Sequence, residues 1–344
     1  MLHLTDIRLR AQQLAAPRFD DPVDLVRWMG MVQAQNYPMA KWAVGLRLRC
    51  PARSRVDDAL RDGRLLRLHV MRPTWHFVAA EDAVWMMRLS ARRIRSANAS
   101  FARGHGVDLS DYVRCLRKVE HALRDDNHLT RPQLVDALQR MGMTIDMSYL
   151  KRLLMHAETD CVVCSGRDCA GTPTYALWAE RVPAAAPLDG DEAAAVLARR
   201  YFSSHAPARL SDFSWWSGLP MTEARRAVES LGGELRRECF GGEEYLMHDT
   251  CSDGQVAPCA CLLPSYDEYL IAYRDRSAVL ADAHRSRAFN AYGLFYPVVL
   301  FGGRVVGRWR EERSLRTEFF AGEKYPSDRQ LRQAAERLSA YRNR

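Results

Sequence analysis

The fold of this chain is decided by residues 130–178, which read TRPQLVDALQRMGMTIDMSYLKRLLMHAETDCVVCSGRDCAGTPTYALW. Thr130 and Gln133 form a capping box, because a hydroxyl and a carboxamide at this spacing bond the free N–H groups of a helix start. Apolar side chains follow at helical spacing until Gly142, a residue that favours a helix end. The stretch therefore predicts a helix that begins after Thr130 and ends before Gly142.

A second helix and a β-hairpin complete this pattern. The helix carries an apolar stripe at positions i, i+3, i+4 and i+7, made of Leu150, Leu153, Leu154 and Ala157. Strands are predicted at 161–164 and 174–178, on either side of a turn region that contains glycine. Helix, helix, hairpin is the order of a winged helix, the helix-turn-helix variant with a β-wing.

The same order recurs after a linker, which the composition predicts at 182–190. Residues 193–249 predict one helix capped by Ser211 and another capped by Thr222. A hairpin follows around Gly241-Gly242, where glycine tolerates the positive φ of a two-residue turn. This region is therefore a second predicted winged helix.

A weaker copy lies at the N-terminus, and the C-terminus differs from all three. The N-terminal copy has an apolar helix over 21–35, a short helix over 56–60 and a hairpin over 64–78. The C-terminal part predicts strands at 259–263, 296–301 and 304–309, the last two joined at Gly302-Gly303, and a closing helix over 328–341. We therefore expect an α+β protein of four parts. These are winged helix 1 (1–118), winged helix 2 (119–183), winged helix 3 (184–256) and a β-rich C-terminal subdomain (257–344).

The composition suits packed cores and a basic surface. The chain has 344 residues, a formal charge of +8, and 46 arginines against four lysines. Guanidinium groups match phosphate oxygens, so the arginine excess suits contact with nucleic acid, although codon usage in a GC-rich genome explains it equally well. No apolar run reaches the roughly 18–20 residues that span a bilayer, and the N-terminus lacks an apolar signal-peptide core. We expect a cytoplasmic protein without membrane segments.

Nine cysteines without a signal peptide favour reduced thiols. Cys161, Cys164 and Cys169 match half of a zinc-ligand pattern, but a fourth ligand at standard spacing is missing. Cysteine also serves as a small apolar residue in a strand such as 161–164. We expect no metal and no cofactor, and a zinc-stabilised interaction protein stays open as an alternative.

The sequence contains no common catalytic signature: no Walker loop, no G-x-S-x-G, no H-E-x-x-H and no dinucleotide fingerprint. Its unusual feature is Gln33-Ala34-Gln35, predicted in the last turn of the helix over 21–35. Gln33 and Gln35 there flank the apolar stripe, where an unpaired carboxamide costs about 1–3 kcal/mol. On spacing alone, capping of the helix end is the better explanation.

A family resemblance changes this assessment. Five stretches resemble the AlkZ/YcaQ-like winged-helix DNA glycosylases, in the same order and over most of the chain: 31–47 (MVQAQNYPMAKWAVGLR), 68–78 (LHVMRPTWHFV), 210–219 (LSDFSWWSGL), 262–276 (LLPSYDEYLIAYRDR) and 301–309 (FGGRVVGRW). The resemblance implies three tandem winged helices in a C shape with a β-rich C-terminal part. It also implies excision of bulky N7-alkylated guanines and, in some members, unhooking of interstrand crosslinks.

The resemblance assigns catalysis to a Gln-x-Gln motif, which Gln33-Ala34-Gln35 matches. N7 alkylation makes guanine cationic and a good leaving group, so the enzyme has only to position a water and stabilise developing positive charge on the sugar. A carboxamide orients water through its carbonyl oxygen but is a poor general base. We therefore expect Gln33 and Gln35 to be catalytic and the substrate to carry an activated glycosidic bond.

Five basic residues are candidate contacts to DNA. Arg72 and His76 fall on the first predicted wing, and Arg92, Arg93 and Arg95 fall on the helix after it. We expect the arginine excess to act at these two elements. The alternatives are a core position for His76 and a merely solvated face for the helix.

Three further residues are expected to support the site: Asn36, which follows the motif, and Asp267 and Arg274, which we expect to form an ion pair. In an ordinary winged helix Lys151 and Arg152 would also read DNA. Stacking of the repeats is expected to bury that surface instead.

The expected function is a monofunctional DNA glycosylase that acts as a monomer on double-stranded DNA carrying alkylation damage, in DNA repair or genotoxin self-resistance. The alternative is a non-enzymatic winged-helix transcriptional regulator, which would bind a defined sequence and release no base. Regulators usually dimerise through an identifiable helix, and no heptad stretch is present in this sequence.

Overall fold

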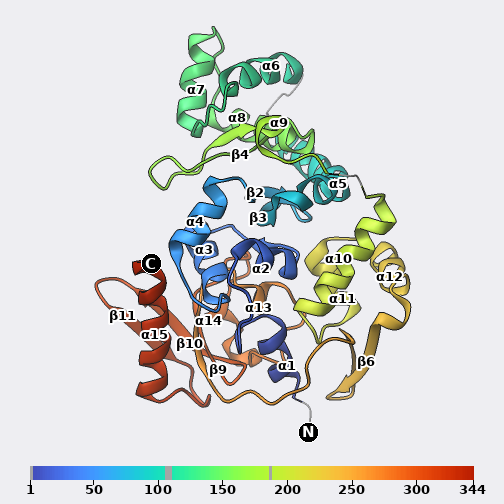
Figure 1. The fold of residues 1–344 in the computed structure, drawn as a ribbon, viewed down its shortest axis with the longest axis vertical. Coiled ribbons are helices and arrows are strands. Elements are labelled where there is room, and N and C mark those ends of the chain that lie inside the picture. The colour runs from blue at the N-terminus through green and yellow to red at the C-terminus, as the bar shows by residue number, and fades with distance from the viewer. Residues whose placement is uncertain (1–2, 105–110, 186–187) are drawn as a thin grey trace. The chain divides into compact units, whose positions relative to one another are not determined.

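The computed structural model describes residues 3–104, 111–185 and 188–344 (Figure 1). The chain divides into two compact units: unit 1 comprises residues 1–57 and 194–344, and unit 2 comprises residues 58–193. Residues 186–187 of the predicted linker lie outside the described residues. Within the described ranges, no helix is both long and apolar enough to cross a membrane.

Along the chain, each predicted winged helix consists of three helices followed by an antiparallel two-stranded hairpin (Figure 1). The first has α2 Pro22–Met29, α3 Tyr37–Leu46, α4 Arg53–Arg61, β2 Leu65–Val70 and β3 Thr74–Ala79. The second has α6 Tyr112–Leu123, α7 Arg131–Arg140, α8 Met147–Thr159, β4 Val163–Ser165 and β5 Tyr175–Leu177. The third has α10 Gly190–Ser204, α11 Leu210–Ser217, α12 Met221–Glu229, β6 Leu235–Phe240 and β7 Glu243–His248. The predicted fold class is confirmed, with one more helix in each copy than predicted.

The β-rich C-terminal part is an antiparallel sheet in unit 1 with the strand order β11-β10-β9-β8. Its strands are β8 Ala260–Leu263, β9 Val298–Phe301, β10 Arg304–Glu311 and β11 Leu315–Phe319. The closing helix is α15, Asp328–Asn343, which packs against β8 and α3. The predicted strands and closing helix are confirmed, and β11 is an additional strand.

The remaining elements are mostly short, apart from the long helix α5. They are α1 Leu4–Ala11, β1 Val32–Gln33, α5 Ala83–Gly104, α9 Trp178–Arg181, α13 Glu268–Ile271, α14 Arg285–Ala288 and the 3₁₀ turns η1 Ala80–Asp82, η2 Gly232–Glu234 and η3 Asp282–His284. The boundary between the two units falls within α4. The four-part division of the chain stays a prediction.

The capping box at Thr130 is confirmed. The Thr130 hydroxyl accepts from the Gln133 N–H, and the Gln133 side chain accepts from the Thr130 N–H at 2.8 Å. All four residues of the α8 stripe are buried. They pack into one apolar cluster with side chains from α6, α7 and β5, so local signals and core packing agree in unit 2.

The predicted caps at Ser211 and Thr222 are wrong. α11 begins at Leu210, two residues before the start that a Ser211 cap would give, and the Arg209 N–H donates to the Asp212 carboxylate at 3.0 Å. α12 begins directly after Pro220, whose side chain makes no capping hydrogen bond. Each helix therefore starts before the hydroxyl that the sequence offered as its cap.

Candidate active site

Gln33 and Gln35 lie on the segment that joins α2 to α3, and not in the last turn of a helix as predicted. α2 ends at Met29 because Gly30 takes a φ of 78°, a conformation that favours glycine. The chain then runs extended through β1, which contains Gln33, and bends at Gln35 before α3 begins. A segment that is largely extended replaces the helix that the apolar spacing indicated over residues 30–35.

The two glutamines lie in different environments. Gln33 is 4% exposed, and its Oε1 has no hydrogen-bond partner among the described residues. Gln35 is exposed. A buried carbonyl oxygen without a donor costs about 1–3 kcal/mol, so Gln33 is suited to accept a hydrogen bond from a small bound molecule.

The main chain of Gln33 is held by a residue that sequence reasoning missed. The Gln33 N–H donates to Oε1 of Glu268 at 2.6 Å, and Glu268 is 1% exposed. A signal existed in the sequence: Asp267-Glu268 is an acidic pair that directly precedes the apolar run 269–273. Buried carboxylates are retained where they are paired, so this pair indicated partners elsewhere in the fold.

Asn36, directly after the motif, is the N-cap of α3, and its support of the site stays a prediction. Its Oδ1 accepts from the Met39 N–H at 3.3 Å, the bond that an N-cap residue makes. The helix therefore begins directly after Gln35, and the local backbone around the motif is defined at this end by a cap.

The predicted ion pair between Asp267 and Arg274 is wrong. The carboxylate of Asp267 is held by Arg47 in two hydrogen bonds of 2.7 and 2.9 Å, with both side chains almost fully buried. Arg274 instead donates its main-chain N–H to Asp212 at 2.9 Å. Burial disfavours the charge on Arg47, but Asp267 more than compensates and the pKa of Arg47 lies above its ordinary value.

Because His205 is buried beside Glu268, we expect the protein to lose stability in mild acid. Burial lowers the pKa of His205 below 6.5, although the Glu268 carboxylate, 3.6 Å from its Nε2, opposes the shift. The unfolded chain binds a proton near pH 6.5 and the folded protein does so only at lower pH, so stability falls as the pH drops through this range. We expect the denaturant midpoint to be lower at about pH 5.5 than at about pH 7.5.

A His205→Gln variant is the control for this prediction. It should lose less stability between the same two pH values, because one proton uptake on unfolding has been removed. His156, whose pKa burial also lowers, is present in both proteins and contributes equally. An identical pH dependence in the two proteins would contradict the role given to His205.

The structure places Arg72 in the turn between β2 and β3 and His76 on β3. Arg72 is partly buried, whereas His76 is fully buried. The His76 Nδ1–H donates to the Thr74 carbonyl at 2.9 Å, which sets the tautomer of the ring. Contact of these two residues with DNA stays a prediction.

The helix after the first wing is α5, as predicted, but Arg95 already has a role within unit 2. Its guanidinium donates to the Thr159 carbonyl at 3.2 Å and to the Asp160 carboxylate at 2.6 Å, where α8 ends. Cations are favoured at a helix C-terminus, so this arrangement is structural. Arg92 is exposed and Arg93 is partly buried, and their contact with DNA stays a prediction.

α8 packs against α5, so the surface that reads DNA in an ordinary winged helix is covered in the second copy. Asn98 donates to the Arg152 carbonyl at 3.0 Å and accepts from the Arg152 guanidinium at 3.2 Å. Arg152 is partly buried, while Lys151 stays exposed, so this surface is covered only in part.

The three cysteines of the half zinc pattern differ in exposure: Cys164 is buried, Cys161 is partly buried and Cys169 is exposed. Burial raises the pKa of Cys164 to about 12 and also raises the pKa of Cys161. A thiol binds metal as thiolate, so these shifts oppose ligation. In the part of the chain that the structure describes, no three His, Cys, Asp or Glu side chains are grouped to hold a metal ion.

The net positive charge belongs to unit 1. Unit 2 has 19 Lys and Arg residues against 18 Asp and Glu, whereas unit 1 has 31 against 24. The first wing and α5 lie in the nearly neutral unit 2, and the expectation that the arginines of these two elements contact DNA stays a prediction. The excess lies in the unit that contains the Gln-x-Gln motif.

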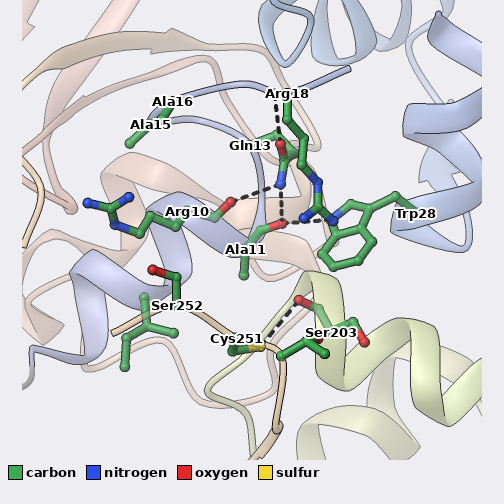
Figure 2. A pocket seen from close by; sticks show the side chains of 12 residues that line it. Arg10, Ala11, Gln13, Ala15, Ala16, Arg18, Trp28, Ser203, Cys251 and Ser252 are labelled. Carbon is green, nitrogen blue, oxygen red and sulfur yellow. Dashed lines mark hydrogen bonds between the residues drawn. The ribbon is translucent and has the colours of Figure 1, made fainter. Parts of the chain in front are cut away.

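A separate pocket of about 180 Å³ lies in unit 1 between α1, α2 and the segment 250–252 (Figure 2). Neither Gln33 nor Gln35 lines it. Its polar groups bond within the protein: Gln13 donates to the carbonyls of Arg10 and Ala11, and the Arg18 guanidinium stacks on Trp28 at 4.0 Å (Figure 2). The motif is therefore the better candidate for the reaction centre.

Comparisons with known proteins agree with this architecture. A family model described as DNA glycosylase AlkZ-like matches residues 26–341. A curated relative from Streptomyces sahachiroi, an interstrand DNA cross-link repair glycosylase, is 28% identical over 321 residues, which cover 88% of this chain and 85% of that protein. The solved structure of Streptomyces sahachiroi DNA glycosylase AlkZ matches with a TM-score of 0.79 and 24% identity, over 98% of this chain and 95% of that chain.

Three successive winged helices and a β-rich C-terminal part define a winged-helix protein of the kind that acts on DNA. The chain belongs to the AlkZ-like DNA glycosylase family. This membership makes it an enzyme that hydrolyses N-glycosyl bonds in DNA, and it favours this function over that of a transcriptional regulator.

Proposed function

We propose that this glycosylase hydrolyses the N-glycosidic bond of bulky N7-alkylguanines in duplex DNA, with Gln33 orienting the attacking water. One observation carries the proposal: Oε1 of Gln33 is buried and, among the described residues, has no hydrogen-bond donor. A bound water supplies the missing donor and in return receives a defined orientation. Gln35, exposed two residues further along, is available to the substrate.

Hydrolysis of this glycosidic bond needs little more than a correctly positioned water. The bond between C1′ of the sugar and N9 of the base breaks, and its electron pair neutralises the cationic base. The water oxygen bonds to C1′, a proton leaves to solvent, and an abasic site remains. A neutral carboxamide is too weak a general base to drive this hydrolysis when the nucleobase is uncharged. The substrate must therefore be activated by N7 alkylation.

Three basic residues remain proposed contacts to the DNA backbone: Arg72, Arg92 and Arg93. The full burial of His76 favours the core position that was its alternative. Arg95 is better explained as a cap for α8. The excess of seven positive charges in unit 1 supports duplex binding by that unit as well, because each neutralised phosphate releases counterions.

Unhooking of interstrand crosslinks is the second proposed activity. The Streptomyces sahachiroi relative is an interstrand DNA cross-link repair glycosylase and is similar over most of both chains. A crosslink through the N7 atoms of two guanines has two glycosidic bonds that are activated in the same way as that of a single adduct. Hydrolysis of either bond releases one strand.

Substrate choice tests the proposal. We expect the protein to release base from a duplex with one defined N7-alkylguanine at least about 100-fold faster than spontaneous depurination. The same duplex without the adduct and a duplex containing uracil are the controls and should give no abasic sites above background. A crosslinked duplex run on a denaturing gel reports unhooking. Appreciable release of uracil would contradict the proposed mechanism.

A further inference from the structure

The position of Gln33 depends on a carboxylate that is distant in the sequence. Oε1 of Glu268 accepts from the Gln33 N–H at 2.6 Å, and Oε2 accepts from the indole Nε1–H of Trp216 at 3.1 Å. Glu268 and Trp216 are both buried within unit 1. The two carboxylate oxygens therefore accept from different N–H donors, and His205 lies 3.6 Å from the same carboxylate. α13, α11 and the motif segment meet at this single side chain.

Trp216 also holds the other end of the same short segment. Its ring lies against Gly30, where a Cβ atom would come within 3.2 Å of the Trp216 Cη2. Gly30 starts the segment with a φ of 78°, and Gln33 ends it on Glu268. The pair of Trp216 and Glu268 thus fixes both ends of residues 30–33.

The residue next to Glu268 secures the far end of α3. Asp267 accepts two hydrogen bonds from Arg47, the residue that follows α3. Consecutive residues 267 and 268 therefore hold the start and the end of the stretch 33–47, which contains the whole motif and the helix after it. This arrangement limits how far the Gln33 carboxamide can move.

We propose that Glu268 is a positioning residue for base excision: by bonding the main chain of Gln33 it sets the place of the Gln33 carboxamide, which in turn sets the place of the water. The inference rests on the proposed role of Gln33. In this role Glu268 acts through Gln33 and is not itself a catalytic residue. Displacement of a reacting group by about 1 Å costs about 100-fold in rate, so a modest shift of this main chain has a large effect.

A Glu268→Gln substitution tests the proposal with little change in shape. Glutamine has one acceptor oxygen where glutamate has two, so either the Gln33 N–H or the Trp216 indole must face an NH₂ group. We expect the single-turnover rate of base release from an N7-alkylguanine duplex to fall about 10- to 100-fold, with DNA affinity within about twofold. A rate within about twofold of the parent protein would overturn the proposal.

A double-mutant cycle separates this inference from the proposed function. If Glu268 acts through Gln33, then Glu268→Gln has little further effect on the rate in a Gln33→Ala protein. If the rate loss of the double variant equals the product of the two single losses, the positioning role of Glu268 is wrong while the role of Gln33 stands. If Gln33→Ala alone leaves the rate unchanged, the proposed function itself is wrong.

Tyr269→Phe is the matched control for a lost buried hydrogen bond. Tyr269 adjoins Glu268 on α13 and donates its hydroxyl to the Gly303 carbonyl at 2.9 Å, away from the motif. The Tyr269→Phe substitution should lower the melting temperature and leave the rate of base release unchanged. A rate loss equal to that of Glu268→Gln would show that general destabilisation explains both.

Trp216→Phe is the second variant, for use if Glu268→Gln does not fold. It removes the indole donor and also the outer part of the indole ring that contacts Gly30, and it should lower the rate of base release. Hydrogen exchange adds a readout that does not depend on activity: peptides that contain the Gln33 amide should exchange faster in both variants. Unchanged exchange at this amide would overturn the anchoring that the proposal needs.

Discussion

Replacement of Gln33 by alanine is expected to lower the single-turnover rate of base excision by about 100- to 1,000-fold, with the affinity for undamaged duplex within about twofold. The buried Oε1 that would orient the water is removed, while Glu268 still holds the main chain of residue 33. The loss therefore reports on the carboxamide itself. Abasic sites are counted over time with the enzyme in excess over an N7-alkylguanine duplex.

Two comparisons make this result specific. Gln35→Ala should also lower the rate, and undiminished base release in that variant would remove Gln35 from the catalytic pair. Gln139→Ala, at an exposed glutamine on α7, should leave the rate unchanged. A Gln33→Ala protein as fast as its parent would overturn the proposed mechanism, since no other role has been given to that carboxamide.

The second large effect concerns stability: Asp267→Asn is expected to lower the free energy of unfolding by about 3–5 kcal/mol. Asparagine keeps the shape and the ability to cap α13, but it leaves the buried Arg47 guanidinium without a carboxylate. Breaking one side of a buried ion pair costs more than the pair contributed, because a charge stays desolvated and unpaired. Equilibrium denaturation in guanidinium chloride measures the loss.

Asp20→Asn is the matched control. Asp20 pairs with Arg49, two residues after Arg47, but about half of each side chain is exposed. Solvent screens such a pair, so the loss should be below about 1 kcal/mol. Similar losses in the two variants would mean that burial is not what makes the Arg47–Asp267 pair important.

Local sequence signals predicted most elements correctly and failed where a longer contact competed. The capping box of Thr130 and the stripe of α8 act within a few residues, so they form wherever the chain is placed. The helix over 21–35 failed because Gly30 turns the chain against Trp216, which is distant in sequence. The apolar residues after Gly30 are buried either way, so their spacing did not reveal the change from helix to extended chain.

The motif was predictable, but its surroundings were not. Gln33 and Gln35 were identified from a resemblance that spans five stretches in order. The hydrogen-bond partners of the motif were not identified, because the sequence does not show which donor a given carboxylate will meet in the fold. Asp267 was assigned to the nearby Arg274, whereas it pairs with Arg47.

The sequence by itself determined most of the helices and hairpins, because these depend on periodicity and caps at short range. Its resemblance to a known family, carried by residue identity over five stretches, singled out the two glutamines of the motif. Tertiary structure alone decided that Gln33 is buried and Gln35 exposed. It also decided that Glu268 and Asp267 hold the two ends of the stretch 33–47. Those contacts join residues 235 and 220 positions apart. The physical reason is that a buried charge or carbonyl must find its partner in space, and folding, not spacing along the chain, determines which groups become neighbours.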